Sequence, residues 1–224
     1  MKTISKMFVF GLIELVVFGA MLFVPAGTFN YWQAWVFLVV VGVSAWAPSI
    51  YQLRKNPAAL QGRMRGGPAA ESRMAQKVVI ASLYVSVAAM VVVSVLDHRF
   101  HWSPVPAALC LAGDALVALG LGVVGLVIIQ NSFAASTVQV RAGQRVVSAG
   151  LYGLVRHPMY TGNVIMLIGI PLALGSYWGL VFVAPGLIVL AWRIRDEEKL
   201  LREELTGYRE YTQSVRYRLV PLMW

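Results

Sequence analysis

Charge is scarce in this chain. Asp, Glu, Lys and Arg make up only 13% of its 224 residues, about half of the roughly 25% in an average soluble chain. Hydrophobic residues account for 58% of the sequence. Apolar stretches long enough to cross about 30 Å of hydrocarbon, at about 1.5 Å per helical residue, recur along it. These features exclude a soluble domain and indicate an integral membrane protein.

Acidic residues, cysteine and histidine are also few. Ten Asp and Glu stand against nineteen Lys and Arg, which gives a net charge of +9. In a membrane protein such an excess is explained by retention of Lys and Arg on the cytoplasmic side, so we expect no nucleic-acid partner. The single cysteine, Cys110, can form no internal disulfide. The three histidines lack the spacing of metal ligands, so we expect no metal site.

The apolar runs predict an all-α fold of about six transmembrane helices. The last two runs are separated by a short turn at 175–177 and predict a C-terminal helical hairpin. The first run follows Lys2 and Lys6, as in a signal peptide, but it is longer than a usual signal core and contains Glu14. We therefore interpret it as a span. The runs cover residues 7–24, 31–50, 78–96, 105–129, 159–174 and 178–192.

The Lys and Arg residues are distributed asymmetrically among the connections. Two precede the first span, six lie in 52–77, three in 130–157 and seven after Trp192. Only Arg99 falls on the other side, a division of eighteen to one. This asymmetry predicts cytoplasmic N- and C-termini. We expect a multi-pass protein of a bacterial inner membrane, with any active site facing the cytoplasm.

The chain divides into an N-terminal part, residues 1–104, and a C-terminal part, residues 105–224. The first holds three spans and the basic loop 52–77, and the second holds the fourth span, a polar loop, the hairpin and a terminal helix. Small residues in the fourth span predict close helix packing. They are Gly113, Ala118, Gly120, Gly122 and Gly125.

Two acidic residues, Glu14 and Asp114, lie within apolar runs. A carboxylate inside the membrane is costly, so each is expected to face the bundle interior or to be neutral. A hydrogen bond to a neighbouring helix is favoured over a role in admitting or orienting a substrate.

The densest polar stretch runs from Gly150 to Asn163. Pro158 suits the first turn of a helix, because its missing N–H costs nothing there. Arg156 and His157 then stand just before a helix N-terminus, whose N–H groups favour an anionic ligand. Tyr160, Gly162 and Asn163 follow on the first turns, where we expect them to line the mouth of a cavity. Simple anchoring of Arg156 and His157 at lipid headgroups is an equal alternative.

A second cluster of charges occupies residues 193–204. Arg193 with Glu197, and Glu198 with Arg202, are four residues apart and can pair on a helix surface. Such pairs contribute only about 0.3–0.5 kcal/mol each. From spacing alone, a solvated amphipathic helix is the favoured interpretation.

Together the two clusters resemble the paired signature of the isoprenylcysteine carboxyl methyltransferase family, to which the phospholipid N-methyltransferases have a related version. Its elements here are Gly150-x-Tyr152-x-x-Val155-Arg156-His157-Pro158-x-Tyr160-x-Gly162, then Glu197-Glu198-x-x-Leu201 after the hairpin, and an ending from Tyr208-x-x-Tyr211 to Arg218-Leu219-x-Pro221. The likeness covers about the last 100 residues. Leu151 departs from it, because relatives usually have Pro there.

The resemblance implies S-adenosylmethionine as cofactor, held between the hairpin and the C-terminal helix. It implies that Arg156 pairs with a carboxylate of the Glu197/Glu198 pair, and we expect Arg156 and Glu198 to be catalytic. The residues expected to bind the cofactor are Gln139, Val140, Tyr152, His157, Tyr160, Gly162, Asn163, Glu197 and Glu198.

The expected function is therefore methyl transfer to a lipid-like or prenylated acceptor within the membrane. O-methylation of a carboxylate such as a prenylcysteine is favoured, because a carboxylate is already nucleophilic at neutral pH. N-methylation of a phospholipid and S-methylation of a small thiol are alternatives. A small transporter with Asp114 and Glu14 on its pathway, or a scaffold whose loop 52–77 binds anionic lipid, belongs to another class.

Overall fold

The described part of the chain consists of helices joined by turns and irregular segments. The computed structural model describes residues 2–55, 71, 73–131, 133–134, 140 and 143–224. No β-strand occurs within these ranges, so the all-α prediction is confirmed for them. The helices are α1 (Lys2–Ala26), α2 (Trp32–Lys55), α4 (Met74–Phe100), α5 (Ala107–Gln130), α6 (Pro158–Ala173), α7 (Val183–Glu204) and α8 (Tyr208–Ser214), with 3₁₀ helices η2 (Gly150–Gly153) and η3 (Trp178–Phe182).

Within the described residues, four helical stretches are long and apolar enough to cross a membrane. They are α2, α4, α5 and the continuous stretch Trp178–Glu204. The apolar stretch Gly11–Ala26, which is part of α1, and helix α6 are shorter than these four stretches, so six crossings stay a prediction. At most 39% of the residues in any of the four apolar windows are buried inside the protein. Apolar surface of this extent indicates a lipid environment.

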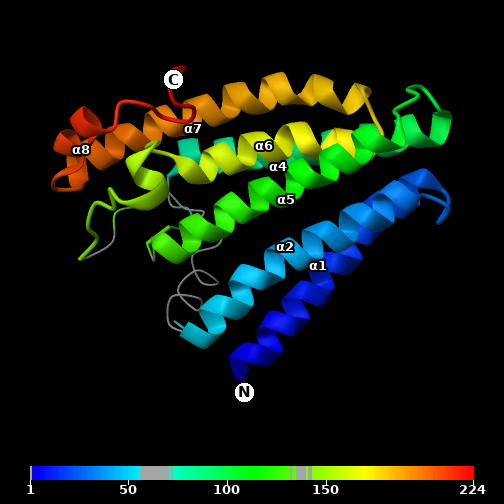
Figure 1. Cartoon of the computed structure of the whole chain (residues 1–224), viewed down its shortest axis with the longest axis horizontal. Coiled ribbons are helices and arrows are strands. Elements are labelled where there is room, and N and C mark those ends of the chain that lie inside the picture. The colour runs from blue at the N-terminus through cyan, green and yellow to red at the C-terminus, as the bar shows by residue number, and fades with distance from the viewer. Residues whose placement is uncertain (1, 56–70, 72, 132, 135–139, 141–142) are drawn as a thin grey trace.

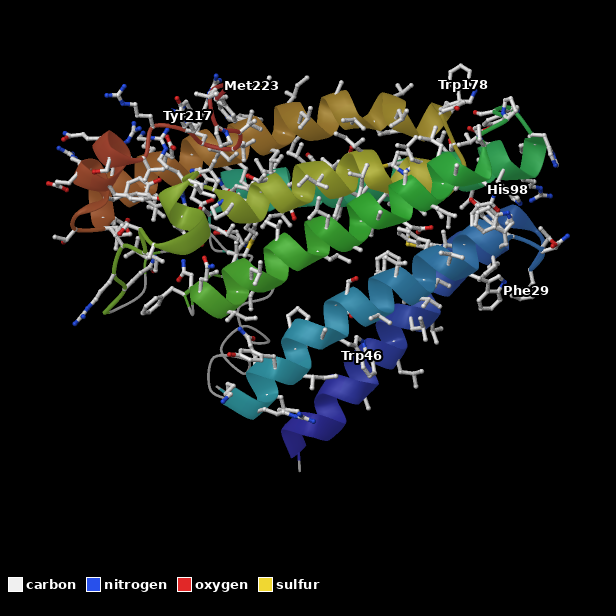
Figure 2. The ribbon with its side chains drawn as sticks, in the orientation of Figure 1. Phe29, Trp46, His98, Trp178, Tyr217 and Met223 are labelled. Atoms are coloured by element: carbon white, nitrogen blue, oxygen red, sulfur yellow. The ribbon has the colours of Figure 1, made fainter. Side chains whose placement is uncertain are left out.

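Helices α4, α5, α6 and α7 lie side by side, whereas α1 and α2 form a hairpin that diverges from them (Figure 1). The α1–α2, α4–α5 and α6–α7 links gather at one end of the molecule, where Figure 2 labels Phe29, His98 and Trp178. The start of α6, the end of α7 and α8 lie at the opposite end. The hairpin of α6 and α7 therefore carries its two polar ends back to the same region.

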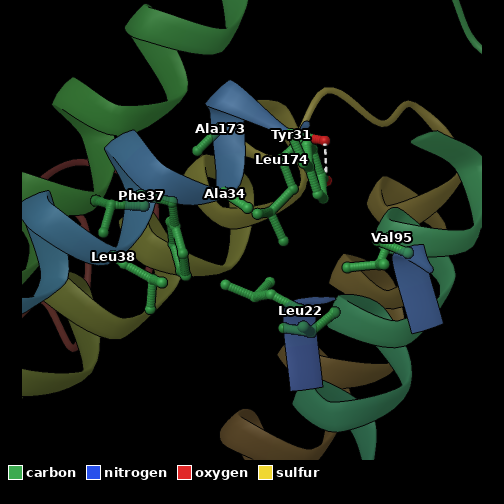
Figure 3. Close-up of a cluster of buried hydrophobic side chains, with 11 residues drawn as sticks. Leu22, Tyr31, Ala34, Phe37, Leu38, Val95, Ala173 and Leu174 are labelled. Carbon is green, nitrogen blue, oxygen red and sulfur yellow. Dashed lines mark hydrogen bonds between the residues drawn. The ribbon is translucent and has the colours of Figure 1, made fainter. Parts of the chain in front are cut away.

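A buried cluster at the link end joins the α1–α2 hairpin to the other helices (Figure 3). Leu22 of α1 and Val95 of α4 pack within it, both fully buried. The Tyr31 hydroxyl donates to the carbonyl oxygen of Leu174 at 2.6 Å. The Tyr31 ring also stacks on His98, with 3.7 Å between ring centroids.

Asp97 fastens two of the links at this end. Helix α4 continues to Phe100, so the turn expected from residue 97 begins later and Asp97 lies in the last helical turn, fully buried. Its carboxylate accepts from the Ser176 hydroxyl at 2.6 Å and from the Ser103 N–H at 2.7 Å. A single side chain thus ties the α4–α5 link to the α6–α7 link.

Glycines let α5 and α6 approach at backbone distance. A Cβ on Gly120 would lie 2.6 Å from the carbonyl oxygen of Gly162, and one on Gly162 would lie 2.7 Å from that of Gly120. Gly125 instead faces α2, where a Cβ on it would lie 2.5 Å from Cγ of Pro48. The prediction of close packing is confirmed at these positions. It is wrong for Gly122, which has open space around it.

The two acidic residues within apolar runs lie in different surroundings: Asp114 is buried inside the bundle, as predicted, whereas Glu14 is not. Glu14 is exposed and lines an apolar groove between α1 and α2, so it does not face the bundle interior. Asp114 is only 4% exposed, and neither of its carboxylate oxygens has a hydrogen-bond partner among the described residues. The helix-to-helix hydrogen bond favoured from the sequence is therefore not formed there.

The glycine contact makes a prediction about stability. Gly120→Ala forces α5 and α6 apart, because its Cβ would meet a backbone carbonyl. Overpacking of this kind costs about 1–3 kcal/mol. We expect the variant to unfold at a lower temperature than the wild type in detergent micelles.

Gly122→Ala is the matched control, since its Cβ would meet no atom within 4 Å. Replacing a helical glycine by alanine there gains about 0.5–1 kcal/mol. Equal melting temperatures for the two variants would contradict the assigned helix contact.

Candidate functional site

A pocket opens at the end of the molecule where α6 begins and α7 ends. Its empty space measures about 810 Å³ when the open solvent at its mouth is included. The segment after α5, η2, the start of α6, the second half of α7 and α8 all contribute walls. Polar and aromatic lining residues include Asn131, Arg145, Tyr152, His157, Tyr160, Glu197 and Tyr208.

The start of α6 is held by the C-terminal segment. The N–H groups of Arg156 and His157 donate to the carbonyl oxygens of Tyr217 and Arg218, each at 2.9 Å. His157 is the N-cap residue of the helix, and Pro158 occupies the first helical turn, as the sequence predicts. Figure 2 labels Tyr217 beside this end of the molecule. The Arg-His-Pro motif is thus fixed from a segment about 60 residues away, a separation typical of tertiary rather than local contacts.

The helix N-terminus offers fewer free donors than the sequence suggests. Pro158 has no N–H, and the N–H groups of Tyr160 and Thr161 both donate to the carbonyl oxygen of His157, at 3.0 and 3.1 Å. Attraction of an anion by the N–H groups of this first turn is correspondingly weakened. Recognition of a ligand here depends mainly on side chains.

Glu198 is the centre of the polar network below the pocket and is 2% exposed. Its Oε1 lies 3.0 Å from Arg156 Nε, an ion pair without hydrogen-bond geometry, and 3.3 Å from His157 Nε2. Its Oε2 accepts from Arg218 Nε at 3.1 Å and from Arg202 Nη2 at 3.3 Å. The expected pairing of Arg156 with the acidic pair is confirmed, and Glu198 is the partner.

Glu197 faces the pocket, whereas Glu198 does not line it. Adjacent helix residues point about 100° apart, so the pair divides between two faces of α7. The Tyr160 hydroxyl donates to Glu197 Oε2 at 2.5 Å and accepts from Arg193 Nε at 2.8 Å. The His157 ring lies beside that of Tyr160, with 5.6 Å between centroids. One pocket wall is therefore a connected set of His, Tyr and Glu.

The interpretation of residues 193–204 as a solvated helix is wrong for its key positions. Arg193 is 5% exposed and Glu198 is 2% exposed. The i,i+4 pair of Glu198 with Arg202 does form. Spacing along one helix could not show that α4, α6 and the C-terminal segment cover this part of α7.

Three tyrosines, Tyr152, Tyr208 and Tyr211, also line the pocket. The Tyr211 hydroxyl donates to the carbonyl oxygen of Tyr152 at 2.7 Å, and the Tyr152 hydroxyl accepts from Asn131 Nδ2 at 3.0 Å. The Tyr208 hydroxyl is buried and has no hydrogen-bond partner among the described residues. Burial raises the pKa of the Tyr152, Tyr208 and Tyr211 phenols, so all three are neutral at physiological pH.

Three further residues expected to bind a cofactor, Val140, Gly162 and Asn163, are not among the residues that line the pocket. Gly162 packs against Gly120 of α5, and Val140 packs beneath α8. Gln139 lies outside the described residues. Their binding roles stay predictions, as do those of Tyr152, His157, Tyr160 and Glu197, which the structure does bring together.

Several residues of the pocket and of the network around Glu198 received no role from the sequence. Tyr208, Tyr211 and Arg218 belong to the C-terminal part of the motif, which was the available signal. Asn131 and Arg145 line the pocket without any motif to mark them. Within the described residues, no three His, Cys, Asp or Glu side chains are grouped as metal ligands.

Comparison with known families adds information about this region. Residues 109–206 match the family model for phospholipid methyltransferase. The matched stretch contains Arg156, His157, Tyr160 and the Glu197–Glu198 pair, and it ends before α8. It supports the wider methyltransferase relationship, whereas the narrower isoprenylcysteine family stays a prediction.

A curated relative shows a different activity in its name. The chain is 29% identical over 94 residues to the Delta(14)-sterol reductase TM7SF2 of Mus musculus. This likeness covers 39% of the chain but only 22% of the reductase. Both comparisons thus concern part of the chain, and the family match places the pocket's two motifs within a methyltransferase-like region.

Proposed function

We propose that this chain is a membrane-embedded methyltransferase that uses S-adenosylmethionine and acts on a lipid-like acceptor. The observation that carries the proposal is the convergence of the Arg156–His157 and Glu197–Glu198 motifs at one pocket, inside the stretch that matches phospholipid methyltransferases.

The pocket residues suit the chemical groups of this cofactor. Glu197 is an acceptor for an ammonium or a ribose diol, and Arg145 is a partner for a carboxylate. The faces of neutral tyrosines attract a sulfonium through cation–π interaction. The Tyr208 hydroxyl is buried and has no partner in the described part of the chain, so it is a donor that a ligand would satisfy. S-adenosylmethionine supplies an electrophilic methyl group when it is bound.

The contribution of the chain to catalysis is then to hold the methyl donor and the acceptor in line. Glu198 fixes Arg156 and His157, and those two residues line the pocket floor. Holding donor and acceptor in line supplies several kcal/mol of a transfer barrier. The ion pair of Arg156 and Glu198 thus supports the pocket residues that align the donor with the acceptor, and Arg156 is the member of the pair that is adjacent to the reactants.

The same arrangement favours an acceptor that arrives without a proton to lose. His157 is engaged with Glu198, and Glu197 accepts from Tyr160. Both of these candidate bases therefore already hold partners. A carboxylate needs no base, which supports O-methylation of a group such as a prenylcysteine. N-methylation of a phospholipid amine is the second candidate, supported by the family match itself.

The pocket end is proposed to face the cytoplasm. Arg99 lies at the link end, while the basic residues of α7, α8 and the C-terminal segment surround the pocket end. Retention of Lys and Arg in the cytoplasm gives this orientation. The cofactor then enters from the aqueous side, and the acceptor reaches the rim from the bilayer.

Labelled S-adenosylmethionine tests the reaction. We expect membranes containing the protein to transfer the labelled methyl group to an extractable lipid-like product. Alkaline hydrolysis would release labelled methanol from a methyl ester but not from an N-methyl amine. Purified protein that bound no S-adenosylmethionine in calorimetry would overturn the proposal. Asp114→Asn should leave transfer intact, whereas the transporter alternative predicts that it abolishes activity.

The two adjacent glutamates are expected to respond differently to the same change. Glu197→Gln should weaken cofactor binding roughly ten- to a hundredfold, the loss of one hydrogen bond to a charged group. Its melting temperature should stay close to that of the wild type, because Glu197 is only partly buried.

Glu198→Gln should instead destabilise the fold by about 3–5 kcal/mol, because it leaves buried cations unpaired. Thermal unfolding and calorimetry on both variants measure the two effects. The division of roles is wrong if Glu198→Gln keeps its stability and loses only cofactor affinity.

A further inference from the structure

Helix α4 reaches the pocket wall through one buried amide, Gln76. Its side chain is fully buried, and both of its polar ends are occupied. Gln76 Oε1 accepts from Arg193 Nη1 at 3.0 Å, and Gln76 Nε2 donates to the Asp196 carboxylate. Gln76 precedes the stretch that matches the methyltransferase family, so the comparison gives it no role.

Arg193 carries this contact to the pocket. Its Nε donates to the Tyr160 hydroxyl at 2.8 Å, and that hydroxyl donates to Glu197. The guanidinium also lies against the Tyr160 ring, 5.8 Å from its centroid. An unbroken series of hydrogen bonds therefore runs from Gln76 to the carboxylate that faces the ligand.

The far side of Gln76 is anchored as well. Arg73 Nη2 lies 2.8 Å from Asp196 Oδ1. Asp196 is therefore held by two residues, Arg73 just before α4 and Gln76 in the first turn of α4. A neutral amide suits this position, because it donates to a carboxylate and accepts from a guanidinium at once. An apolar side chain would leave both charged partners short of a bond, and a carboxylate would repel Asp196.

We propose that Gln76 is a positioning residue of the cofactor site. It fixes the Arg193 guanidinium, which holds the Tyr160 hydroxyl and through it the Glu197 carboxylate. The inference rests on the proposed function, and it extends the site to the N-terminal part of the chain, where no motif indicated one.

A double-mutant cycle on the full-length protein tests this, with the dissociation constant of S-adenosylmethionine measured by calorimetry. Gln76→Leu should weaken binding about tenfold, the loss expected for one hydrogen bond to a charged group. Tyr160→Phe removes the hydroxyl through which Gln76 acts. In that background Gln76→Leu should have no further effect, because the path is already broken.

Gln52→Leu is the matched control. Gln52 is also a buried glutamine, and its Nε2 donates to the carbonyl oxygen of Ile128 at 3.0 Å. Its substitution should change affinity by the same factor with Tyr160 or Phe at position 160. If Gln76→Leu does not fold, Gln76→Asn replaces it, since it keeps a neutral amide that is one methylene shorter and no longer reaches Arg193 Nη1.

The outcomes separate the two proposals. Independent, additive effects of the Gln76 and Tyr160 substitutions would overturn the positioning role, as would unchanged affinity in the Gln76 variants. Either result leaves the proposed function standing when the wild type binds the cofactor. A wild type without measurable binding overturns both.

Discussion

A negative charge buried among cations is the constraint on which the candidate site depends. Removing a carboxylate from water is costly unless its charge and lone pairs are compensated. Glu198 meets that condition by drawing Arg156 and His157 together with Arg218, from two separate parts of the chain. The fold of the pocket region follows from this requirement, because the residues before α6 and the C-terminal segment must both reach α7.

Helix packing sets where that meeting occurs. The glycine contacts between α5 and α6 bring the two backbones together along the membrane region. At the far end, Tyr31 and Asp97 fix the links through hydrogen bonds to Leu174 and Ser176. Helix α6 is therefore held at both of its ends. A ligand site needs such support if its side chains are to be preorganised.

The sequence predicted the helical class, the positions of the apolar helices and the pairing of Arg156 with the acidic motif, because hydropathy and local motifs carry that information. It misjudged Arg193 and Glu198 as solvated, since burial depends on elements far away in the chain. The exposure of Glu14 and the lack of a hydrogen-bond partner for Asp114 among the described residues were not foreseen, because periodicity does not say which face of a helix has a partner. Asn131 and Gln76 had no local signal at all.

The division of labour between Glu197 and Glu198 has a consequence for how such proteins can diverge. Their roles differ only by the angle of one residue step around α7. Inserting a single residue between η3 and Glu197 would rotate the pocket-facing carboxylate into the cationic cluster, and deleting one would rotate Glu198 out of that cluster towards the pocket. Length changes in this helix are therefore tolerable only in steps of three or four residues, so evolution can alter its membrane depth by whole turns but cannot tune it continuously.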